Sequence, residues 1–243
     1  MTKLQFLDSY IEEQLLKTRQ EQRANHTPSG KLSASMLGSP TQWQVLKTIG
    51  VPQKELDEYV VRKFERGNHV EEWVLGFMKG IVNKQKFVEY RNTVGYVDAL
   101  VDMRDWNLDM EVIPHEIKSV SNANFKWIEK GGAKEGHILQ GALYALALKS
   151  ENFAIDYIAT DDYRVSTFLF KTADYKDRVD GIITAYDKAM ESGVVPVFEP
   201  KEKWMSEPKY NNFPEFSKLT PIEIDLLLQK SYPQEYNKLK GIK

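Results

Sequence analysis

The chain has 243 residues, of which 42% are hydrophobic and 28% charged, and its formal net charge at pH 7 is −2. This length and composition predict one domain, or two small ones, with a substantial core. The absence of cysteine excludes disulfides, thiolate zinc sites, cysteine-bound iron–sulfur clusters and cysteine nucleophiles. The near-neutral net charge is weak evidence for or against whole-molecule attraction to nucleic acid, since basic residues can still be concentrated locally. Neither an apolar signal core nor a run of about 18 apolar residues occurs, so we expect a cytoplasmic protein without a membrane span.

The first 52 residues are expected to form a helical N-terminal extension. Residues 3–24 carry apolar side chains at helical spacing, and residues 41–50 form a second, shorter helical segment. The turn-rich stretch between them contains Ser33 and Ser35. These serines are candidates for contact with phosphate, and capping or turn formation is the competing interpretation.

Residues 53–79 again show helical periodicity, and Gly67 is expected to separate two helices there. Glu71 then lies near the start of the second helix, where the helix dipole favours an acid. A role as dipole partner therefore competes with any role of Glu71 in a site.

Residues 94–120 have the pattern of two β-strands joined by a polar turn at 104–107. Strand periodicity places Asp98 opposite its apolar neighbours and puts Glu116 and Lys118 on one face. Buried charges are costly unless a metal ion or mutual pairing compensates them. These strands therefore indicate a site, and the competing interpretation is a sheet edge with a solvated Asp98 and a Glu116–Lys118 ion pair.

Residues 121–133 are expected to form a loop, and residues 135–149 a helix. On this helix Gln140 and Tyr144 share a face because they are four residues apart. A place at the edge of the core is the competing interpretation for this pair. Lys134, just before the helix, is a candidate contact for nucleic acid or ordinary solvated surface.

The rest of the chain completes an α/β or α+β fold with a central mixed sheet flanked by helices. His115 lies on the apolar side of its strand and is expected to be a core histidine. Further strands are expected at 153–160 and 164–170, a helix at 174–192 and short helices at 221–229 and 233–238. The expected parts of one domain are a helical extension (1–52), a core (53–193) and an irregular C-terminal wrap (194–243).

Four short motifs follow one another: G-x-x-x-E at Gly67–Glu71, G-x-x-D at Gly95–Asp98, E-x-K at Glu116–Lys118 and Q-x-x-x-Y at Gln140–Tyr144. In this order they resemble the PD-(D/E)XK nuclease superfamily, specifically its RecB-like and lambda-exonuclease-like branch. The resemblance implies a restriction-endonuclease-like core and a divalent-metal-dependent deoxyribonuclease, most simply an exonuclease of phage or bacterial DNA recombination, repair or replication.

Three alternatives stay open beside the exonuclease. The first is an endonuclease of the same superfamily. The second is a catalytically inactive DNA-binding accessory protein that keeps the nuclease fold. The third is a protein-interaction domain in which the motifs occur by chance.

The resemblance also implies a metal site. Asp98, Glu116 and the carbonyl of Ile117 would bind Mg²⁺, which Mn²⁺ could replace, and Glu71 would approach directly or through water. Many RecB-like members have a histidine at the position of Glu71, so this motif departs from theirs. Hard oxygen ligands of this kind suit magnesium and phosphodiester hydrolysis.

The remaining motif residues would act on water and substrate. Lys118 would orient or activate the attacking water, and Gln140 would hold that lysine or a phosphate. Tyr144 would support the phosphate site or the packing of its helix. The implied partner is single- or double-stranded DNA. A recombination or single-strand-binding protein and an oligomeric form are open possibilities.

Overall fold

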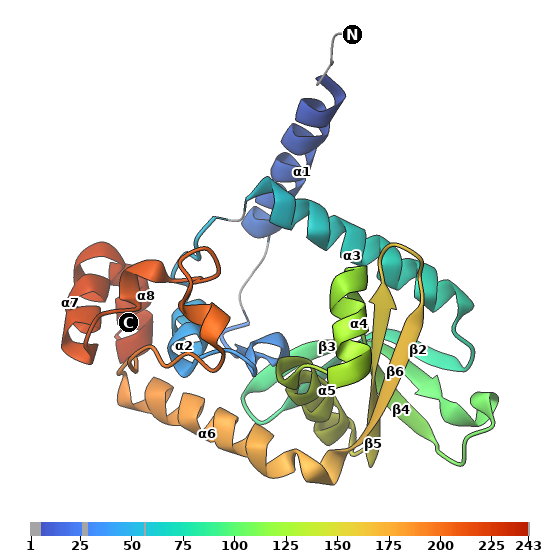
Figure 1. The fold of residues 1–243 in the computed structure, drawn as a ribbon. Coiled ribbons are helices and arrows are strands. Elements are labelled where there is room, and N and C mark those ends of the chain that lie inside the picture. Colours follow the sequence, from blue (N-terminus) through green and yellow to red (C-terminus); the bar gives the residue numbers. More distant parts are fainter. Residues whose placement is uncertain (1–5, 26–28, 56, 243) are drawn as a thin grey trace.

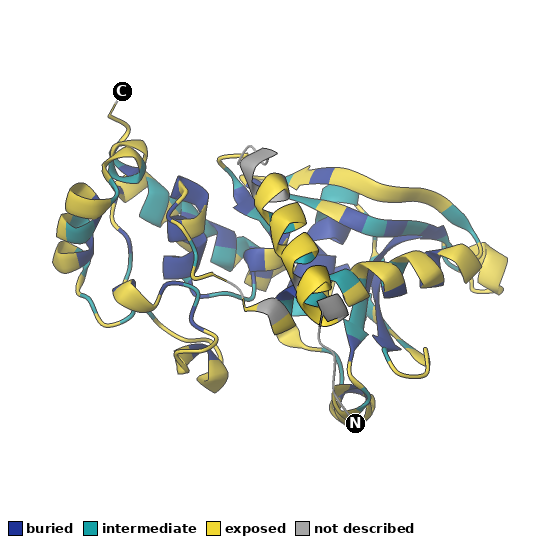
Figure 2. Ribbon diagram, turned by 90° about the horizontal axis from the view of Figure 1, so that it is seen from above, coloured by how far each residue is buried: buried dark blue, intermediate teal, exposed yellow. Residues whose placement is uncertain are grey.

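A computed structural model of the chain describes residues 6–25, 29–55 and 57–242. Its first helix, α1 (Phe6–Asn25), confirms the helical pattern at 3–24, of which residues 3–5 lie outside the described part. α1 projects from the body of the molecule (Figure 1), and its described side chains are mostly exposed (Figure 2). An ion pair of 2.8 Å between Asp8 and Arg62 ties it to α3 (Glu58–Phe77).

α3 is one continuous helix, so the predicted break at Gly67 is wrong. Asp57 caps the helix by accepting a hydrogen bond from Val60 N. A Cβ on Gly67 would lie 3.3 Å from Ser119 Oγ on the sheet. The glycine therefore permits close packing between helix and sheet instead of ending a helix.

The described residues form a mixed six-stranded sheet, which confirms the predicted centre of the fold. Its order is β1-β3-β4-β5-β6, and β2 pairs with β3 as an antiparallel hairpin. The strands β3 and β4 are interior, so the competing interpretation of a sheet edge is wrong. The strands are β1 (Leu32–Ser33), β2 (Ile81–Tyr90), β3 (Thr93–Asp102), β4 (Val112–Val120), β5 (Asn152–Ala159) and β6 (Val165–Lys171).

The connection between β3 and β4 is longer than the predicted turn at 104–107. A short 3₁₀ helix (Met103–Trp106) follows β3 directly, and Asn107 adopts a left-handed conformation with φ of 58°. A further loop leads to β4, which pairs antiparallel with β3. The antiparallel pair is thus confirmed, but it is not joined by a tight hairpin.

β4 and β5 are parallel, and parallel neighbours need a crossover connection. The helices α4 (Asn122–Gly131) and α5 (Glu135–Leu148) make this crossover. The loop predicted at 121–133 is therefore wrong over most of its length.

The turn-forming residues of that segment begin a helix instead of a loop. Ser121 Oγ accepts a hydrogen bond of 3.5 Å from Asn124 N, which is the position of an N-cap. Phe125 and Ile128 are buried at helical spacing and fix the helix on the protein. Tertiary packing thus outweighs the local turn preference.

Each face of the sheet carries its own apolar core. α3 packs on one face, where Val70 and Val74 join Ala99, Ile117 and Ala154. α5 packs on the other face in a larger cluster. β5 is buried on both faces, as expected for an interior strand beside a parallel neighbour.

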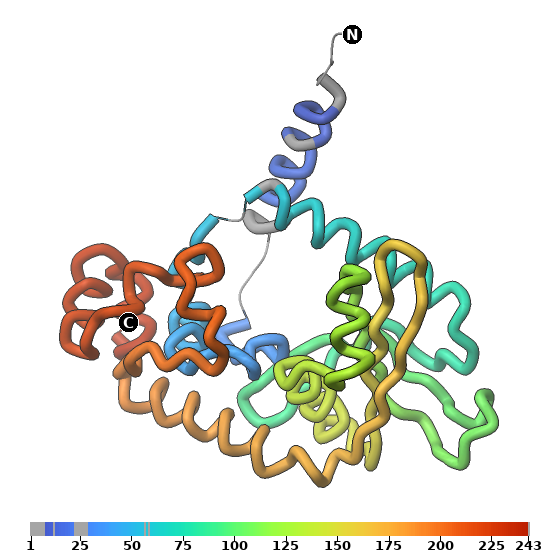
Figure 3. The backbone as a smooth tube through the Cα atoms, in the orientation of Figure 1, coloured from blue at the N-terminus to red at the C-terminus, as the bar shows by residue number. Residues whose placement is uncertain are grey.

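The terminal segments complete the larger core. α2 (Thr41–Ile49), α7 (Pro221–Ser231) and α8 (Pro233–Lys240) lie together at the end of the molecule away from the sheet (Figure 3). α6 (Lys176–Ser192) joins them to the sheet. The helices predicted at 174–192, 221–229 and 233–238 are confirmed.

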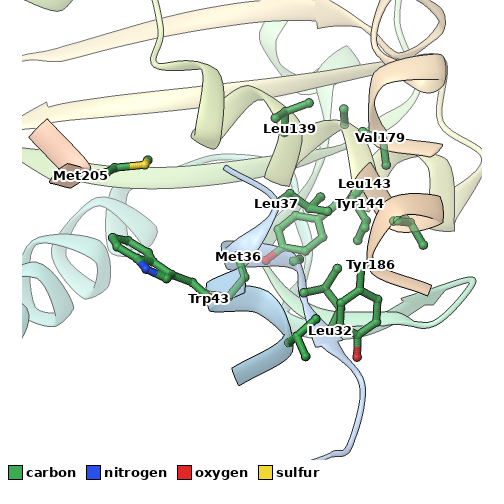
Figure 4. Close-up of a cluster of buried hydrophobic side chains, with 14 of the residues drawn as sticks. Leu32, Met36, Leu37, Trp43, Leu139, Leu143, Tyr144, Val179, Tyr186 and Met205 are labelled. Atoms are coloured by element: carbon green, nitrogen blue, oxygen red, sulfur yellow. The ribbon is translucent and has the colours of Figure 1, made fainter. Parts of the chain in front are cut away.

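The larger core gathers side chains that are far apart in sequence. Figure 4 shows Leu37, Trp43, Tyr144, Tyr186 and Met205 in one buried cluster. The C-terminal segment thus contributes to the same core as α5. Among the described residues, no helix is both long enough and apolar enough to cross a bilayer.

We predict that Gly95→Ala destabilises the protein by about 1–3 kcal/mol, because overpacking forces neighbours from their rotamers. A Cβ on Gly95 would lie 2.7 Å from Tyr144 Cε1 and 2.9 Å from Ala34 Cβ. Urea denaturation measures the change in the free energy of unfolding.

Gly181→Ala is the matched control, since Gly181 lies inside α6 with nothing within 4 Å of its added Cβ. Its helix propensity should stabilise the protein by about 0.5–1 kcal/mol. Equal stability of the Gly95→Ala variant and the wild type would contradict the close approach.

Candidate active site

The candidate site opens where β3 and β4 separate. Their ladder runs from Asp102 and Val112 to Ala99 and His115. Beyond that pair, Ile117 N donates a hydrogen bond of 2.7 Å to Asp98 Oδ2. A side-chain carboxylate thus occupies a position that a neighbouring strand would otherwise take.

Glu116 and Lys118 share the other face of β4 from Ile117, which confirms the predicted alternation. Glu116 Oε1 and Lys118 Nζ form an ion pair, and the Glu116 side chain is only 2% exposed. Glu116 Oε2 is buried without a hydrogen-bond partner among the described residues. A buried oxygen of this kind can accept a further ligand.

Burial and mutual repulsion set the charge states of this cluster. Burial raises the pKa of Glu116 to about 8, against the opposing charge of Lys118. Burial also raises the pKa of Asp98, against the hydrogen bond from Ile117 N. Burial lowers the pKa of Lys118, but the charges of Glu116, Asp98 and Glu71 outweigh it and the pKa is raised. The cluster therefore favours cations.

Glu71 reaches the same cluster from α3. Burial, and then the charge of Asp98, raises the pKa of Glu71. Because α3 begins at Glu58, Glu71 is far from the helix start, and the interpretation as a dipole partner is wrong. An open pocket of about 610 Å³ borders the acids and is lined by Asn68, Glu71, Glu72, Leu75, Lys84, Gln85 and Asp98.

Gln85 links two of the acids and was not predicted from the sequence. Its Nε2 donates to Glu71 Oε1 at 2.8 Å and lies 3.4 Å from Asp98 Oδ1. Gln85 has φ of 50° within β2, a left-handed conformation that is uncommon for a non-glycine residue. The strand pattern carries no signal for this, because the hydrogen bonds to distant residues stabilise the conformation.

The Q-x-x-x-Y pair bonds internally on α5. Gln140 Nε2 donates to Tyr144 Oη at 2.8 Å, and both side chains are buried. Burial, and then the charge of Glu116, raises the pKa of Tyr144. The Tyr144 ring lies over Gly95 of β3, so the glycine of one motif makes room for the tyrosine of another. A core position thus coexists with proximity to Glu116.

The two proposed substrate contacts outside the motifs differ in their placement. Ser35 lies in a 3₁₀ turn (Ala34–Met36) with its Oγ 2.9 Å from Ser33 Oγ, which confirms the interpretation as a turn residue. Contact of Ser35 with phosphate stays a prediction. Lys134 immediately precedes α5, and its backbone N donates to Tyr157 Oη at 3.0 Å.

His137 is hydrogen-bonded near Lys134 and feels the charge of Lys118. Its Nδ1 lies 2.8 Å from Tyr157 Oη. The Tyr157 hydroxyl already accepts a hydrogen bond from Lys134 N. We therefore assign the Tyr157 hydroxyl as the donor and His137 Nδ1, in the neutral imidazole, as the acceptor. Burial, then the charges of Lys118 and Lys134, lowers the pKa of His137 to about 3.

His115 is buried on the α3 side of the sheet, which confirms the predicted core histidine. Its Nδ1 lies 2.6 Å from Asp156 Oδ2, and Thr167 Oγ1 donates to Asp156 Oδ1 at 2.5 Å. His115 and Glu116 are consecutive residues of β4, so their side chains point to opposite faces of the sheet. His115 therefore does not belong to the acid cluster.

The donor set fits a divalent cation, although no three acidic or histidine side chains of the described part converge closely enough to hold one by themselves. The observation that carries the fit is the buried, unpartnered Glu116 Oε2 beside Asp98. Carboxylate oxygens are the ligands that Mg²⁺ prefers, and it retains several waters. The two carboxylates would therefore suffice as protein ligands together with water.

We predict that the wild type loses stability faster than His137→Gln as the pH falls from about 6 to 4. His137 is neutral in the folded protein, whereas in the unfolded chain it takes up a proton below about 6.5. Because the unfolded state then binds more protons, the extra loss approaches about 1.4 kcal/mol per pH unit.

Urea denaturation of both proteins at several pH values measures the difference between them. Subtraction removes the titration of the carboxylates that both proteins share. Parallel curves for the two proteins would contradict a neutral, buried His137.

No protein-family model matches this chain, and no curated protein matches its sequence. Among solved structures, SSO0001 is similar with a TM-score of 0.55 at 19% identity, over 86% of this chain and 98% of that protein. The alkaline exonuclease LHK-Exo from Laribacter hongkongensis has a TM-score of 0.48 at 15% identity, over 68% and 92% of the two chains. A phage-related exonuclease from Haemophilus somnus has a TM-score of 0.42 at 16% identity, over 67% and 96%. The similarity to SSO0001 shows that a solved protein shares this helix-flanked mixed sheet.

Proposed function

We propose that the protein is a divalent-metal-dependent deoxyribonuclease that hydrolyses phosphodiester bonds, acting as an exonuclease on DNA ends. The observation that carries the proposal is the buried Glu116 with its unpartnered Oε2, paired with Lys118 and adjacent to Asp98. Burying this much charge is unfavourable unless a counter-charge compensates it, because each desolvated charge opposes folding. The order of the four sequence motifs supports the same proposal.

The acids would supply the metal site. Asp98 and Glu116 are the proposed ligands, with the carbonyl of Ile117 and, directly or through water, Glu71. When bound, Mg²⁺ or Mn²⁺ supplies positive charge that neutralises the phosphate and favours attack by water. The Ile117 N–H holds one Asp98 oxygen at 2.7 Å, which fixes the orientation of the carboxylate before a cation arrives.

Lys118 would act on the reacting groups themselves. Its ammonium has three donors, and the ion pair with Glu116 uses one of them. Its side chain is 27% exposed, so the remaining donors can reach a phosphate oxygen or hold the attacking water in line. Gln140 and Tyr144, which bond each other at 2.8 Å, would support this arrangement from α5.

Thermal stabilisation by a metal ion tests whether these residues form a metal site or come together by chance. At about 100 times its dissociation constant, Mn²⁺ should stabilise the folded protein by about 2.7 kcal/mol, raising Tm by about 5–10 °C. Glu116→Gln should abolish the shift in a thermal scan without DNA. The matched control is Glu72→Gln, since exposed Glu72 lines the same pocket beside Glu71. A full shift in Glu116→Gln would refute the proposed ligand.

Cleavage of end-labelled linear DNA and covalently closed circular DNA tests the reaction. With Mg²⁺, the wild type and Glu72→Gln should degrade only the linear form, whereas Glu116→Gln and Lys118→Met should be slower by at least about 100-fold. Release of the label gives the polarity of digestion.

The other outcomes of this assay distinguish the alternatives. Cutting of the closed circle would assign an endonuclease. Intact linear and single-stranded DNA after incubation with folded protein and either metal would refute the nuclease. If such a protein still binds DNA and Lys118→Ala loses that affinity, an inactive DNA-binding accessory protein is the correct interpretation.

A further inference from the structure

A pocket of about 500 Å³ lies between the start of α5 and the C-terminal segment, and the proposed mechanism does not use it. Its two aromatic walls are Trp127 of α4, coloured green in Figure 1, and Trp204 of the C-terminal segment, coloured orange. Their exposed fractions are 65% and 42%, which is high for such large apolar side chains. Both indole rings are therefore available to a ligand.

The surrounding contacts hold the pocket in shape. Trp204 Nε1 donates to Glu202 Oε2 at 2.6 Å, and the ring stands edge-on to Tyr210 with 5.7 Å between centroids. The floor is backbone, since a Cβ on Gly38 would lie 2.7 Å from Gly136 Cα. The Trp204 wall is thus restrained by specific contacts.

The charges at the pocket suit a phosphate backbone. Lys134 and Lys201 line it, and Lys201 Nζ donates one hydrogen bond to Leu37 O at 2.8 Å. Of the acids there, Glu135 forms an ion pair with Arg178. The second acid, Glu202, accepts the hydrogen bond from Trp204 described above. Two lysines beside two exposed tryptophans combine cationic and stacking groups, as single-strand binding surfaces do.

The pocket is also close to the proposed catalytic residues. Lys134 is joined to His137 through Tyr157, and the charge of Lys118 reaches the same histidine. Along α5, Lys134 and Gln140 are six residues apart, which corresponds to about 9 Å of helix. A strand with the duplex rise of about 3.4 Å per nucleotide covers this distance in about two or three nucleotides, and a more extended unpaired strand covers it in fewer.

We infer that this pocket binds unpaired nucleotides of the DNA strand whose phosphodiester is cleaved, with bases stacked on Trp127 and Trp204 and phosphates at Lys134 and Lys201. The inference rests on the proposed nuclease function and assigns its substrate a single-stranded end. A paired base cannot occupy the pocket in this way, because its faces are covered by its neighbours in the duplex.

Binding without turnover tests the inference separately from cleavage. A fluorescein-labelled oligothymidine of twelve nucleotides is titrated with protein carrying Glu116→Gln, in EDTA, and followed by fluorescence anisotropy. Adding Trp127→Ala or Trp204→Ala should raise Kd about tenfold each, since stacking contributes about 1–3 kcal/mol per base. Trp127→Tyr should restore most of the affinity because it keeps an aromatic face.

Two exposed tryptophans elsewhere provide matched controls. Trp73 and Trp106 are 43% and 46% exposed and line a different pocket, next to His115. Trp73→Ala and Trp106→Ala should leave Kd within twofold. Equal losses in all four variants would overturn the assignment of the pocket.

The salt dependence of Kd and the affinity for duplex DNA are two measurements that would not change if these residues had only a structural role. Lys134→Gln should reduce the slope of log Kd against log salt concentration by about 0.7, the value for one phosphate contact of a single strand. A blunt twelve-base-pair duplex should be insensitive to Trp127→Ala. Equal sensitivity of duplex and single strand would overturn the single-strand assignment.

The inference and the proposed function can fail independently. If the tryptophan variants weaken binding but the wild type cleaves no DNA, the pocket stands and the catalytic proposal falls. If the wild type cleaves DNA and neither tryptophan variant changes Kd, the pocket assignment falls.

Discussion

The structure around the site depends on the burial of Glu116 beside Lys118 at the point where β3 and β4 separate. The carboxylate is 2% exposed, and burial raises its pKa to about 8 despite the neighbouring ammonium. A charge in such a position requires compensation, because transfer from water is costly. Lys118 provides part of it, and the unpartnered Glu116 Oε2 is the atom that would bind the proposed cation.

The two helices that cover the sheet complete this site from opposite sides. α3 brings Glu71 to the acids, and α5 brings Tyr144 over Gly95. Both approaches use glycines, since Gly67 allows α3 to lie close to Ser119 of β4. The glycines of the first two motifs therefore act through packing.

Two further sets of contacts surround the cluster of Asp98, Glu116 and Lys118. Gln85 donates from one amide to both Glu71 and Asp98, which partly offsets the repulsion between the two carboxylates. On the other side, hydrogen bonds join Lys134, at a pocket bounded by the C-terminal segment, through Tyr157 to His137, whose pKa is lowered by burial and then by the charge of Lys118. The same core that anchors α5 also anchors Met205 of this segment, so the pocket wall and α5 share one support.

The sequence by itself determined the strands β3 to β6, most helices and the faces on which Asp98, Glu116 and Lys118 lie, because these follow from local periodicity. Its turn and glycine signals missed α4 and split α3, since burial of Phe125 and Ile128 and the close approach of Gly67 to Ser119 outweigh local preference. Only the tertiary structure decided the strand separation, the left-handed Gln85 and the pocket between Trp127 and Trp204. Each of these depends on contacts between residues distant in the chain, and no local pattern of side chains encodes them.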